Sequence, residues 1–247
     1  MRYFIRLSFD GAKFHGWQIQ KNANSVQSEL NNALGMVLKI KDIETIGCGR
    51  TDTGVHAKKF FAHFENDEIQ NTNELIHQLN SVLPHAIVSH SIFPVGERDH
   101  ARFSATSRTY VYRLYRKKDP FLRDRAYFFP FNPDIERMNI VAEKLLDHND
   151  FSSFSKSNTQ TLTNICKITN AQWKNEGDEL IFTITADRFL RNMVRAIVGT
   201  LLKAGLNKMN DKEFADILES RSRSEAGVSV PAHGLYLTDI TYPFPVF

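Results

Sequence analysis

The sequence predicts an α+β protein made of two ferredoxin-like halves, each with the element order βαββαβ, that share a central antiparallel sheet. Three observations support this fold class. Strand-like and helix-like runs alternate in that order in the first half, the second half repeats the order, and no Pro/Gly/Ser-rich linker separates the halves. We therefore expect halves 1–105 and 106–247 to form one body, with a core drawn from the 42% of residues that are hydrophobic.

The first half contains clear start and stop signals for its helices. The elements expected there are a strand over 2–9, a helix over 25–39, strands over 43–48 and 59–64, a helix over 73–82 and a strand over 86–93. Asn24 and Ser25 are good helix caps ahead of apolar residues at helical spacing. Pro84 ends the second helix, because the residue before a proline avoids helical geometry.

The second half repeats the order of elements, although no sequence repeat is visible. The elements expected there are a strand over 107–116, a helix over 134–147, a hairpin of strands 165–174 and 179–185, a helix through Ala204, a short helix near 211–219 and a strand over 235–241. Asp187 is expected to cap the helix that ends at Ala204.

Composition excludes several classes of protein. The two cysteines, Cys48 and Cys166, cannot form a disulfide framework, which indicates a reducing compartment such as the cytoplasm. No apolar run approaches the ~20 residues of a membrane helix, and the N-terminus lacks the pattern of a signal peptide. The nine histidines and two cysteines show no metal-ligand spacing, so no metal site is expected.

Positive charge is concentrated between Arg98 and Arg125. This segment holds nine Lys or Arg against three Asp, a local balance of +6, whereas the whole chain carries only +3. Its interleaved aromatic residues are Phe103, Tyr110, Tyr112, Tyr115 and Phe121. Such a pattern suits a surface that contacts nucleic-acid phosphates with its charges and stacks bases on its rings. The same pattern suits a solvent-exposed edge strand whose lysines prevent pairing with other strands. The segment alone does not decide between these two interpretations.

The glycine-rich stretch from Gly47 to Ala57 is the most informative for chemistry. It lies between two expected strands, where the sheet can hold a loop rigid. Asp52 follows Arg50 and Thr51, which could keep a carboxylate ionised and oriented. An ordinary Asp-Thr-Gly turn is the plainer alternative. A phosphate-binding loop fits poorly, since no Gly-Lys-Ser/Thr follows.

The stretch Arg50-Thr51-Asp52-Thr53-Gly54-Val55-His56-Ala57 resembles the active-site motif of the TruA family of tRNA pseudouridine synthases, with Thr53 in place of the usual alanine. The resemblance extends over nearly the whole chain. The other matching segments are Asp10-Gly11-x-x-Phe14-x-Gly16-Trp17-Gln18, Ser25-Val26-Gln27, Leu79-Asn80-x-x-Leu83-Pro84, Ala101-Arg102-Phe103-Ser104-Ala105-Thr106-x-Arg108-x-Tyr110-x-Tyr112, Asp150-Phe151-x-Ser153-Phe154, Met193-Val194-Arg195-x-Ile197-Val198-Gly199 and Gly234-Leu235-Tyr236-Leu237. Segment 157–167 departs most from the family pattern, with Gln160, Leu162 and Asn164 near the place of an expected arginine.

The resemblance implies the pseudouridine synthase fold and an isomerase that converts uridine to pseudouridine at positions 38 to 40 of the tRNA anticodon stem-loop. It implies that Asp52 is the catalytic carboxylate, that Tyr110 lies against the flipped base and that Arg195 pairs with Asp52. The further residues expected to contact the RNA are Arg50, Arg102, Arg108 and Arg191. It also implies a homodimer bound to tRNA, with no cofactor, no membrane and no other protein partner.

Two of these residues have plainer interpretations. Tyr110 could be a core aromatic on a strand. Arg188, Arg191 and Arg195 fall at helical spacing beside an apolar face, where an arginine either extends its charge to solvent or finds a buried acid. Because the Asp52 motif supplies a candidate acid, we expect Arg195 to pair with it and not to extend its charge to solvent.

Two other functions stay open as alternatives. One is a non-catalytic RNA-binding protein of paired ferredoxin-like units, for which the usual aromatic ribonucleoprotein motifs are missing from the sequence. The other is a phosphatase or hydrolase that uses Asp52, which would need a metal or a second acid nearby.

Overall fold

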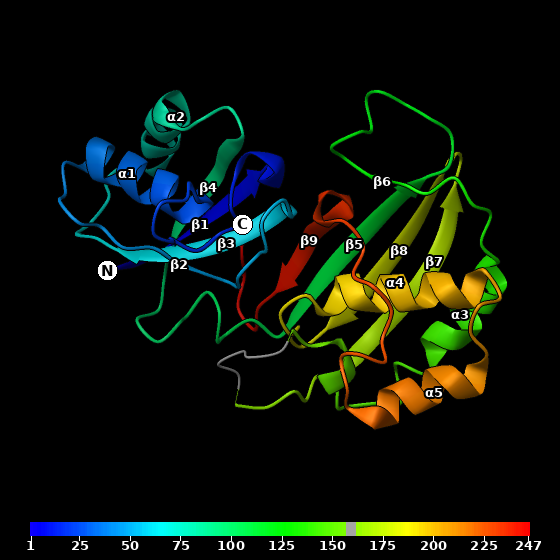
Figure 1. Ribbon diagram of the computed structural model, residues 1–247. Coiled ribbons are helices and arrows are strands. Elements are labelled where there is room, and N and C mark those ends of the chain that lie inside the picture. Colours follow the sequence, from blue (N-terminus) through cyan, green and yellow to red (C-terminus); the bar gives the residue numbers. More distant parts are fainter. Residues whose placement is uncertain (157–161) are drawn as a thin grey trace. The chain divides into compact units, whose positions relative to one another are not determined.

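The computed structural model describes residues 1–156 and 162–247 and confirms the α+β class (Figure 1). The described residues form five α-helices and nine strands, and the sheet is mixed because one of its pairings is parallel. Two compact units divide the chain. Unit 1 comprises Met1–Thr106 with Leu237–Phe247, and unit 2 comprises Ser107–Tyr236.

Unit 1 shows the element order β1-α1-β2-β3-α2-β4. Its elements are β1 (Arg2–Phe9), α1 (Val26–Leu38), β2 (Ile46–Gly47), β3 (His56–Glu65), α2 (Thr72–Val82), β4 (Ile87–Val95) and most of β9 (Leu235–Thr241). The strands lie in the order β4-β1-β3-β9, with β1 antiparallel to both of its neighbours, and β2 pairs with β3. Helices α1 and α2 lie side by side on one face of this sheet (Figure 1).

The other face of the unit 1 sheet is covered by the C-terminal tail. Phe4 of β1 lies 5.3 Å from the ring of Tyr242 and 5.7 Å from that of Phe244. Phe61 of β3 lies 5.4 Å from Tyr242, measured between ring centroids. Phe4 and Phe61 are completely buried as a result.

Unit 2 is also built of helices and strands. Its elements are β5 (Ser107–Tyr115), β6 (Tyr127–Phe128), α3 (Ile135–Glu143), β7 (Ile168–Glu176), β8 (Glu179–Ala186), α4 (Met193–Gly205), α5 (Asp211–Ser220) and the first residues of β9. Strand β8 lies between β5 and β7 and is antiparallel to both, whereas β6 is parallel to β5. Most of α4 is buried, and α3 packs against α4 and β7.

Asp187 was expected to cap the helix that ends at Ala204, and that expectation is wrong. The helix, α4, begins at Met193, six residues after Asp187. The Asp187 carboxylate accepts the backbone N–H groups of Lys167 and Arg188, at 2.8 and 2.7 Å, so it ties two segments together and does not cap a helix. Asn192 then takes a left-handed conformation, with φ of 67°. Arg188 and Arg191 consequently lie in a loop over 187–192, and only Arg195 is helical.

Smaller differences concern the ends of elements. Strand β2 has two residues where 43–48 was expected, and β7 begins at Ile168 and not at 165. Helix α3 ends at Glu143, four residues before the expected 147. Lys144, Leu145 and Leu146 donate to carbonyls three residues back, which is the tighter geometry common at helix ends.

Candidate active site

Asp52 lies in the loop between β2 and β3 of unit 1, at the first position of a tight turn. The Val55 N–H donates to the Asp52 carbonyl at 3.1 Å across Thr53 and Gly54. Gly54 has φ of +81°, a left-handed value that favours glycine. Asp52 is half-buried and belongs to the loop, not to a helix or strand.

A second loop, residues 10–17, braces the Asp52 loop from the side. The Trp17 N–H donates to the Thr51 carbonyl at 3.3 Å, and the Gly54 N–H donates to the Phe14 carbonyl at 3.4 Å. Gly16 has φ of +86°, and a Cβ atom there would stand 2.3 Å from the Thr51 oxygen. The two backbones can approach this closely only with glycine at position 16, and the approach fixes the backbone next to Asp52.

His56 belongs to the same scaffold. Its ring is 1% exposed, and Nδ1 lies 3.1 Å from the Gly11 nitrogen and 3.0 Å from an Asp10 carboxylate oxygen. One ring nitrogen cannot both accept from Gly11 and donate to Asp10. The Gly11 N–H points at Nδ1 with hydrogen-bond geometry, and the Asp10 carboxylate lies against the same nitrogen, so the ring ties residues 10 and 11 to the start of β3.

Thr51 carries an unusual hydroxyl. The residue is 8% exposed, and its Oγ1 has no hydrogen-bond partner among the described residues. Thr45, at the other end of the same chain segment, is fully buried but donates its hydroxyl to Asn31 Oδ1 at 2.7 Å. Among the described residues of the unit, the Ser89 hydroxyl is also buried and unpaired, but the Thr51 hydroxyl is the one next to Asp52 in the chain.

Two of the expected RNA-contacting arginines also belong to unit 1. Arg50 precedes Thr51 in the Asp52 loop, and its side chain is exposed. Arg102 is exposed as well, with its guanidinium 5.4 Å from the ring centroid of Phe103. Both are accessible to an anionic partner.

Tyr110 lies on β5 of unit 2, opposite Ile184 of β8. It is half-buried, and Phe189 meets its ring edge-to-face at 5.1 Å. Tyr112, two residues on, is fully buried and donates its hydroxyl to the Pro231 carbonyl at 2.7 Å. Burial strongly raises the pKa of the Tyr112 hydroxyl, so this tyrosine is structural and stays neutral.

Loop 187–192 brings two more expected residues to the same end of β5 and β8. Arg108 pairs with Ala186 in the strand register and donates from Nη1 to the Asp187 carbonyl at 2.7 Å. Arg191 is exposed, and its carbonyl accepts the Lys156 N–H at 3.1 Å. Arg108, Tyr110 and the loop that carries Arg191 therefore lie at one end of β5 and β8.

Arg195 lies in the first turn of α4 and is half-buried. Its Nε donates to the Val230 carbonyl at 2.7 Å, and its own carbonyl accepts the Val230 N–H at 3.2 Å. The Nε bond holds one edge of the guanidinium in a fixed direction, and the backbone bond keeps the Val230 acceptor in place. The sequence did not indicate Val230 or Phe189, because a backbone acceptor and a packing ring leave no residue-type pattern.

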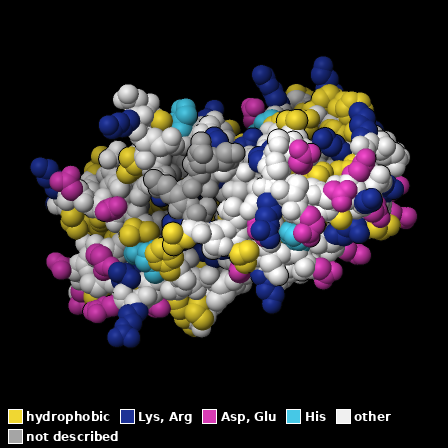
Figure 2. All heavy atoms as spheres, turned by 60° about the horizontal axis from the view of Figure 1, so that its bottom comes forward, with side chains coloured by type: hydrophobic (Ala, Val, Ile, Leu, Met, Phe, Trp, Pro, Cys, Tyr) yellow, Lys and Arg dark blue, Asp and Glu magenta, His cyan; other side chains and the backbone are white. Residues whose placement is uncertain are grey.

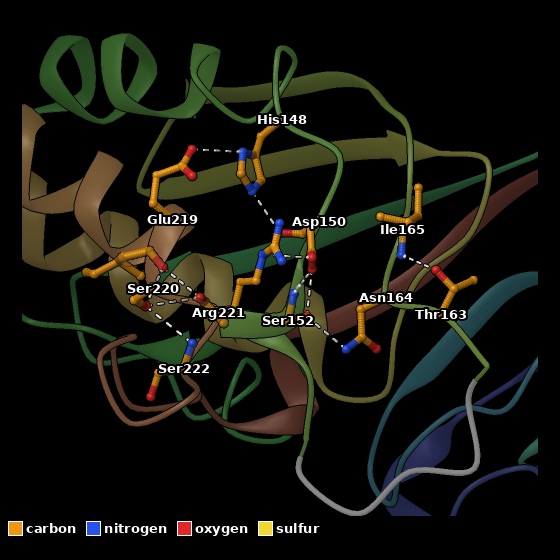
Figure 3. A network of polar contacts seen from close by, with 12 residues as sticks. His148, Asp150, Ser152, Thr163, Asn164, Ile165, Glu219, Ser220, Arg221 and Ser222 are labelled. Carbon is orange, nitrogen blue, oxygen red and sulfur yellow. Dashed lines mark hydrogen bonds and ion pairs between the residues drawn. The ribbon is translucent and has the colours of Figure 1, made fainter.

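A second polar cluster lies near the end of α5, and its geometry does not support hydrolytic chemistry (Figure 3). The Ser152 hydroxyl donates to Asp150 at 2.6 Å, while a ring nitrogen of His148 contacts the Asp150 backbone carbonyl at 2.8 Å. Among the described residues His148 therefore faces a backbone carbonyl and not the serine hydroxyl. The Ser152 hydroxyl holds the pKa of Asp150 below its usual range, and Arg221 lies 3.1 Å from the same carboxyl group. The cluster ties residues 148–152 to α5.

Charge and metal-ligand chemistry are unremarkable elsewhere. On the face shown in Figure 2, Lys and Arg side chains are interspersed with Asp and Glu. Within residues 1–156 and 162–247, no group of three or more His, Cys, Asp or Glu could hold a metal ion. None of the helices in the described part of the chain is long and apolar enough to cross a membrane. Of the divergent segment 157–167, Gln160 lies outside the described residues.

Comparison with known proteins identifies the family. A family model described as tRNA pseudouridine synthase matches residues 141–243. The tRNA pseudouridine synthase A of Parabacteroides distasonis is 47% identical over 247 residues, which cover 100% of this chain and 98% of that protein. The protein of the same name from Bacteroides thetaiotaomicron is 47% identical over 100% of this chain and 92% of its own length. The one from Bacillus subtilis is 37% identical over 98% of this chain and 99% of its own length. This similarity spans both units and confirms the resemblance seen in the motifs, so the chain belongs to the tRNA pseudouridine synthase A family.

Proposed function

We propose that this protein isomerises uridine to pseudouridine at positions 38 to 40 of the tRNA anticodon stem-loop, with Asp52 as the catalytic carboxylate. The observation that carries the proposal is the Asp52 turn, clamped by the loop over 10–17 inside a chain that matches the family along its whole length. A clamped backbone presents a carboxylate in one direction, which is what catalysis by positioning requires.

The reaction needs one carboxylate and no redox change. The bond from C1′ to N1 of the uridine breaks, the uracil turns, and C1′ joins C5, while a proton leaves C5 and N1 gains one. Asp52 can serve as a nucleophile at C1′ or at the ring, or as a base at the ribose. Each role asks for an ionised and oriented carboxylate, and we propose that Arg195 provides this by pairing with it. The bonds to Val230 support that role, because they orient the guanidinium in advance.

The target base must leave its stack, which costs roughly a few kcal/mol. We propose that Tyr110, steadied by Phe189, lies against the extruded uracil. We propose that the RNA phosphates are bound by the arginines that the resemblance implies, namely Arg50, Arg102, Arg108 and Arg191. Charge-assisted bonds to phosphate fix the position of the RNA without reading its sequence.

The proposal extends to organisation. Halves 1–105 and 106–247 would act as one catalytic body, and two copies would bind tRNA as a homodimer in the cytoplasm. No cofactor takes part in the proposed reaction.

The non-catalytic RNA-binding alternative is disfavoured by one observation. Such a module stacks bases on aromatic residues of its open sheet face. In unit 1 the aromatic residues on that face, Phe4 and Phe61, are fully buried beneath Tyr242 and Phe244. They are unavailable to bases while the tail is in place.

The test is incubation with unmodified tRNA followed by mapping of pseudouridine at single-nucleotide resolution. Asp52→Asn should abolish the product and leave tRNA affinity within a few-fold, since the change removes a charge and little volume. Asp67→Asn is the matched control, because Asp67 is an exposed aspartate of the same unit. Substantial turnover by Asp52→Asn would remove Asp52 from the catalytic role, and product at other uridines would correct the substrate positions.

A further inference from the structure

The aromatic residues of segment 98–125 differ sharply in accessibility. Tyr112 and Tyr115 are buried, whereas Phe103 is 75% exposed and Phe121 is 88% exposed. Phe103 lies against another ring, that of His100, with 4.4 Å between centroids. Among the described residues Phe121 has no such ring contact, so Phe103 is the exposed ring with a fixed support.

The turn that carries Phe103 is rigid. His100 Nδ1 accepts the N–H groups of Arg102 and Phe103, at 3.0 and 3.2 Å. The His100 N–H donates to the Ser104 hydroxyl at 2.9 Å, and the Ser104 N–H donates back to the His100 carbonyl at 3.0 Å. A ring presented by such a turn loses little conformational freedom when a ligand covers it.

A short column of rings connects Phe103 with the core. The ring of His63, which is 3% exposed, meets that of His100 at 4.6 Å, and His63 Nδ1 accepts the Ala101 N–H at 3.1 Å. Burial lowers the pKa of both histidines, and Arg2 lowers them further. Both rings are therefore neutral at pH 7 and act as aromatic packing behind Phe103.

Arg102 adds positive charge at the surface end of this column. Its guanidinium lies 5.4 Å from the centroid of Phe103, and its side chain is exposed. An accessible ring next to an arginine suits an unpaired nucleotide, because the base can stack on the ring while the phosphate meets the cation.

We propose that Phe103, supported by His100 and flanked by Arg102, is a stacking platform for one unpaired base of the RNA substrate. The platform rests on the proposed function, because tRNA is the RNA that it would hold. The role of the platform differs from that of Tyr110, a residue of unit 2 that is proposed to contact the extruded uracil.

The test is the affinity of the full-length protein for an unmodified tRNA transcript, measured by fluorescence anisotropy. Phe103→Ala and Phe103→Leu should weaken binding about 5- to 150-fold, the range for loss of one stacked base. Phe103→Trp keeps an aromatic face and should bind like the parent protein. Phe247→Ala is the matched control, since Phe247 is 69% exposed and also rests on a ring of unit 1, that of Phe93.

Salt dependence separates stacking from phosphate contact. The Phe103 variants should keep the slope of log affinity against log salt, whereas Arg102→Ala should lower it by about one contact. Thermal unfolding of Phe103→Leu should match the parent, and a large drop would make the ring structural and overturn the platform.

Three further outcomes are informative. Binding of Phe103→Ala within two-fold of an active parent protein overturns the platform and leaves the proposed function intact. Lower oligomer mass with unchanged tRNA affinity would make Phe103 a contact between copies of the chain and also overturn it. If the parent forms no pseudouridine in tRNA, the proposed function fails, and binding of the same variants to a single-stranded uridine-rich oligonucleotide decides the platform by itself.

Discussion

Thr51→Val should make the protein more stable, which is the opposite of what most buried Thr→Val changes do. The Thr51 hydroxyl is buried without a partner among the described residues, and an unpaired buried polar group costs about 1–3 kcal/mol. Valine keeps the shape and replaces the hydroxyl with a methyl group. The Trp17 bond to the Thr51 carbonyl is a backbone contact and survives the change.

We expect the free energy of unfolding to rise by about 1–2 kcal/mol. For a chain of 247 residues, each kcal/mol moves the melting temperature by about 2–4 °C. Urea unfolding should show a higher midpoint at an unchanged slope, which marks a change in stability alone.

Thr45→Val is the matched control for this experiment. Thr45 is also buried, but its hydroxyl donates to Asn31 at 2.7 Å, so the same substitution there should destabilise by about 1 kcal/mol. Equal destabilisation by the two variants would refute the reasoning, because it would mean that the Thr51 hydroxyl is paired in solution. A gain in stability together with a loss of turnover would indicate that the hydroxyl finds its partner when tRNA binds.

Three further predictions concern the proposed site and its surroundings. Arg195→Ala should reduce turnover far more than stability, because the Nε bond to Val230 is one contact at a half-buried position; a variant that simply unfolds would make Arg195 structural. Tyr110→Phe should bind tRNA normally yet turn over about 10²–10⁴-fold more slowly if its hydroxyl relays the proton from C5, whereas a rate equal to the parent would limit Tyr110 to stacking and Tyr110→Leu should then fail. Burial, followed by the charges of His100 and Arg2, lowers the pKa of His63 from 6.5 to about 4, so the unfolded chain binds a proton that the folded protein refuses, and stability should fall as pH drops from 6.5 to 4. Urea unfolding measured at several pH values in this window gives the slope of the free energy of unfolding against pH. In His63→Gln this slope should be smaller than in the parent by up to about 1.4 kcal/mol per pH unit, the value for one proton, and an equal slope in the two proteins would contradict the pKa shift.

Local signals predicted the helices of unit 1 well because their ends are encoded by nearby residues. The Ser25 hydroxyl accepts the Ser28 N–H at 3.2 Å, and α1 begins one residue later, at Val26. Asn71 caps α2 in the same way, and Pro84 follows one residue after the end cap at Leu83. Capping and proline sterics act within a few residues, so sequence alone carries them.

The helix expected from Asp187 failed because its carboxylate binds a backbone segment, just before β7, that is distant in sequence. The carboxylate accepts the Lys167 N–H, 20 residues away in sequence, and this bond has no local pattern. The helical spacing of Arg188, Arg191 and Arg195 was therefore a coincidence, and only Arg195 shares the fixed geometry of α4.

The sequence named the residues of the candidate site, which stay a prediction, but it did not indicate the contacts that support them. The motif around Asp52 pointed to the loop, yet the bracing by residues 10–17 depends on a backbone approach from another part of the chain. The same holds for Val230 behind Arg195 and for Phe189 behind Tyr110, since neither contact follows from residue type.

The basic segment 98–125 shows most clearly how tertiary contacts change the meaning of a charge count. Arg113 is held by two bonds to Glu179, at 2.9 and 2.7 Å, and Lys117 lies 2.9 Å from Asp178. Both acids come from the hairpin between β7 and β8, far away in sequence, so the local balance of +6 overstates the charge that an RNA would meet. The fold also buries Tyr112 and Tyr115 and leaves Phe103 exposed beside Arg102. The segment is thus partly a paired, structural strand, and the part that keeps both an accessible ring and an exposed arginine is the turn at 100–104, where RNA contact should be sought first.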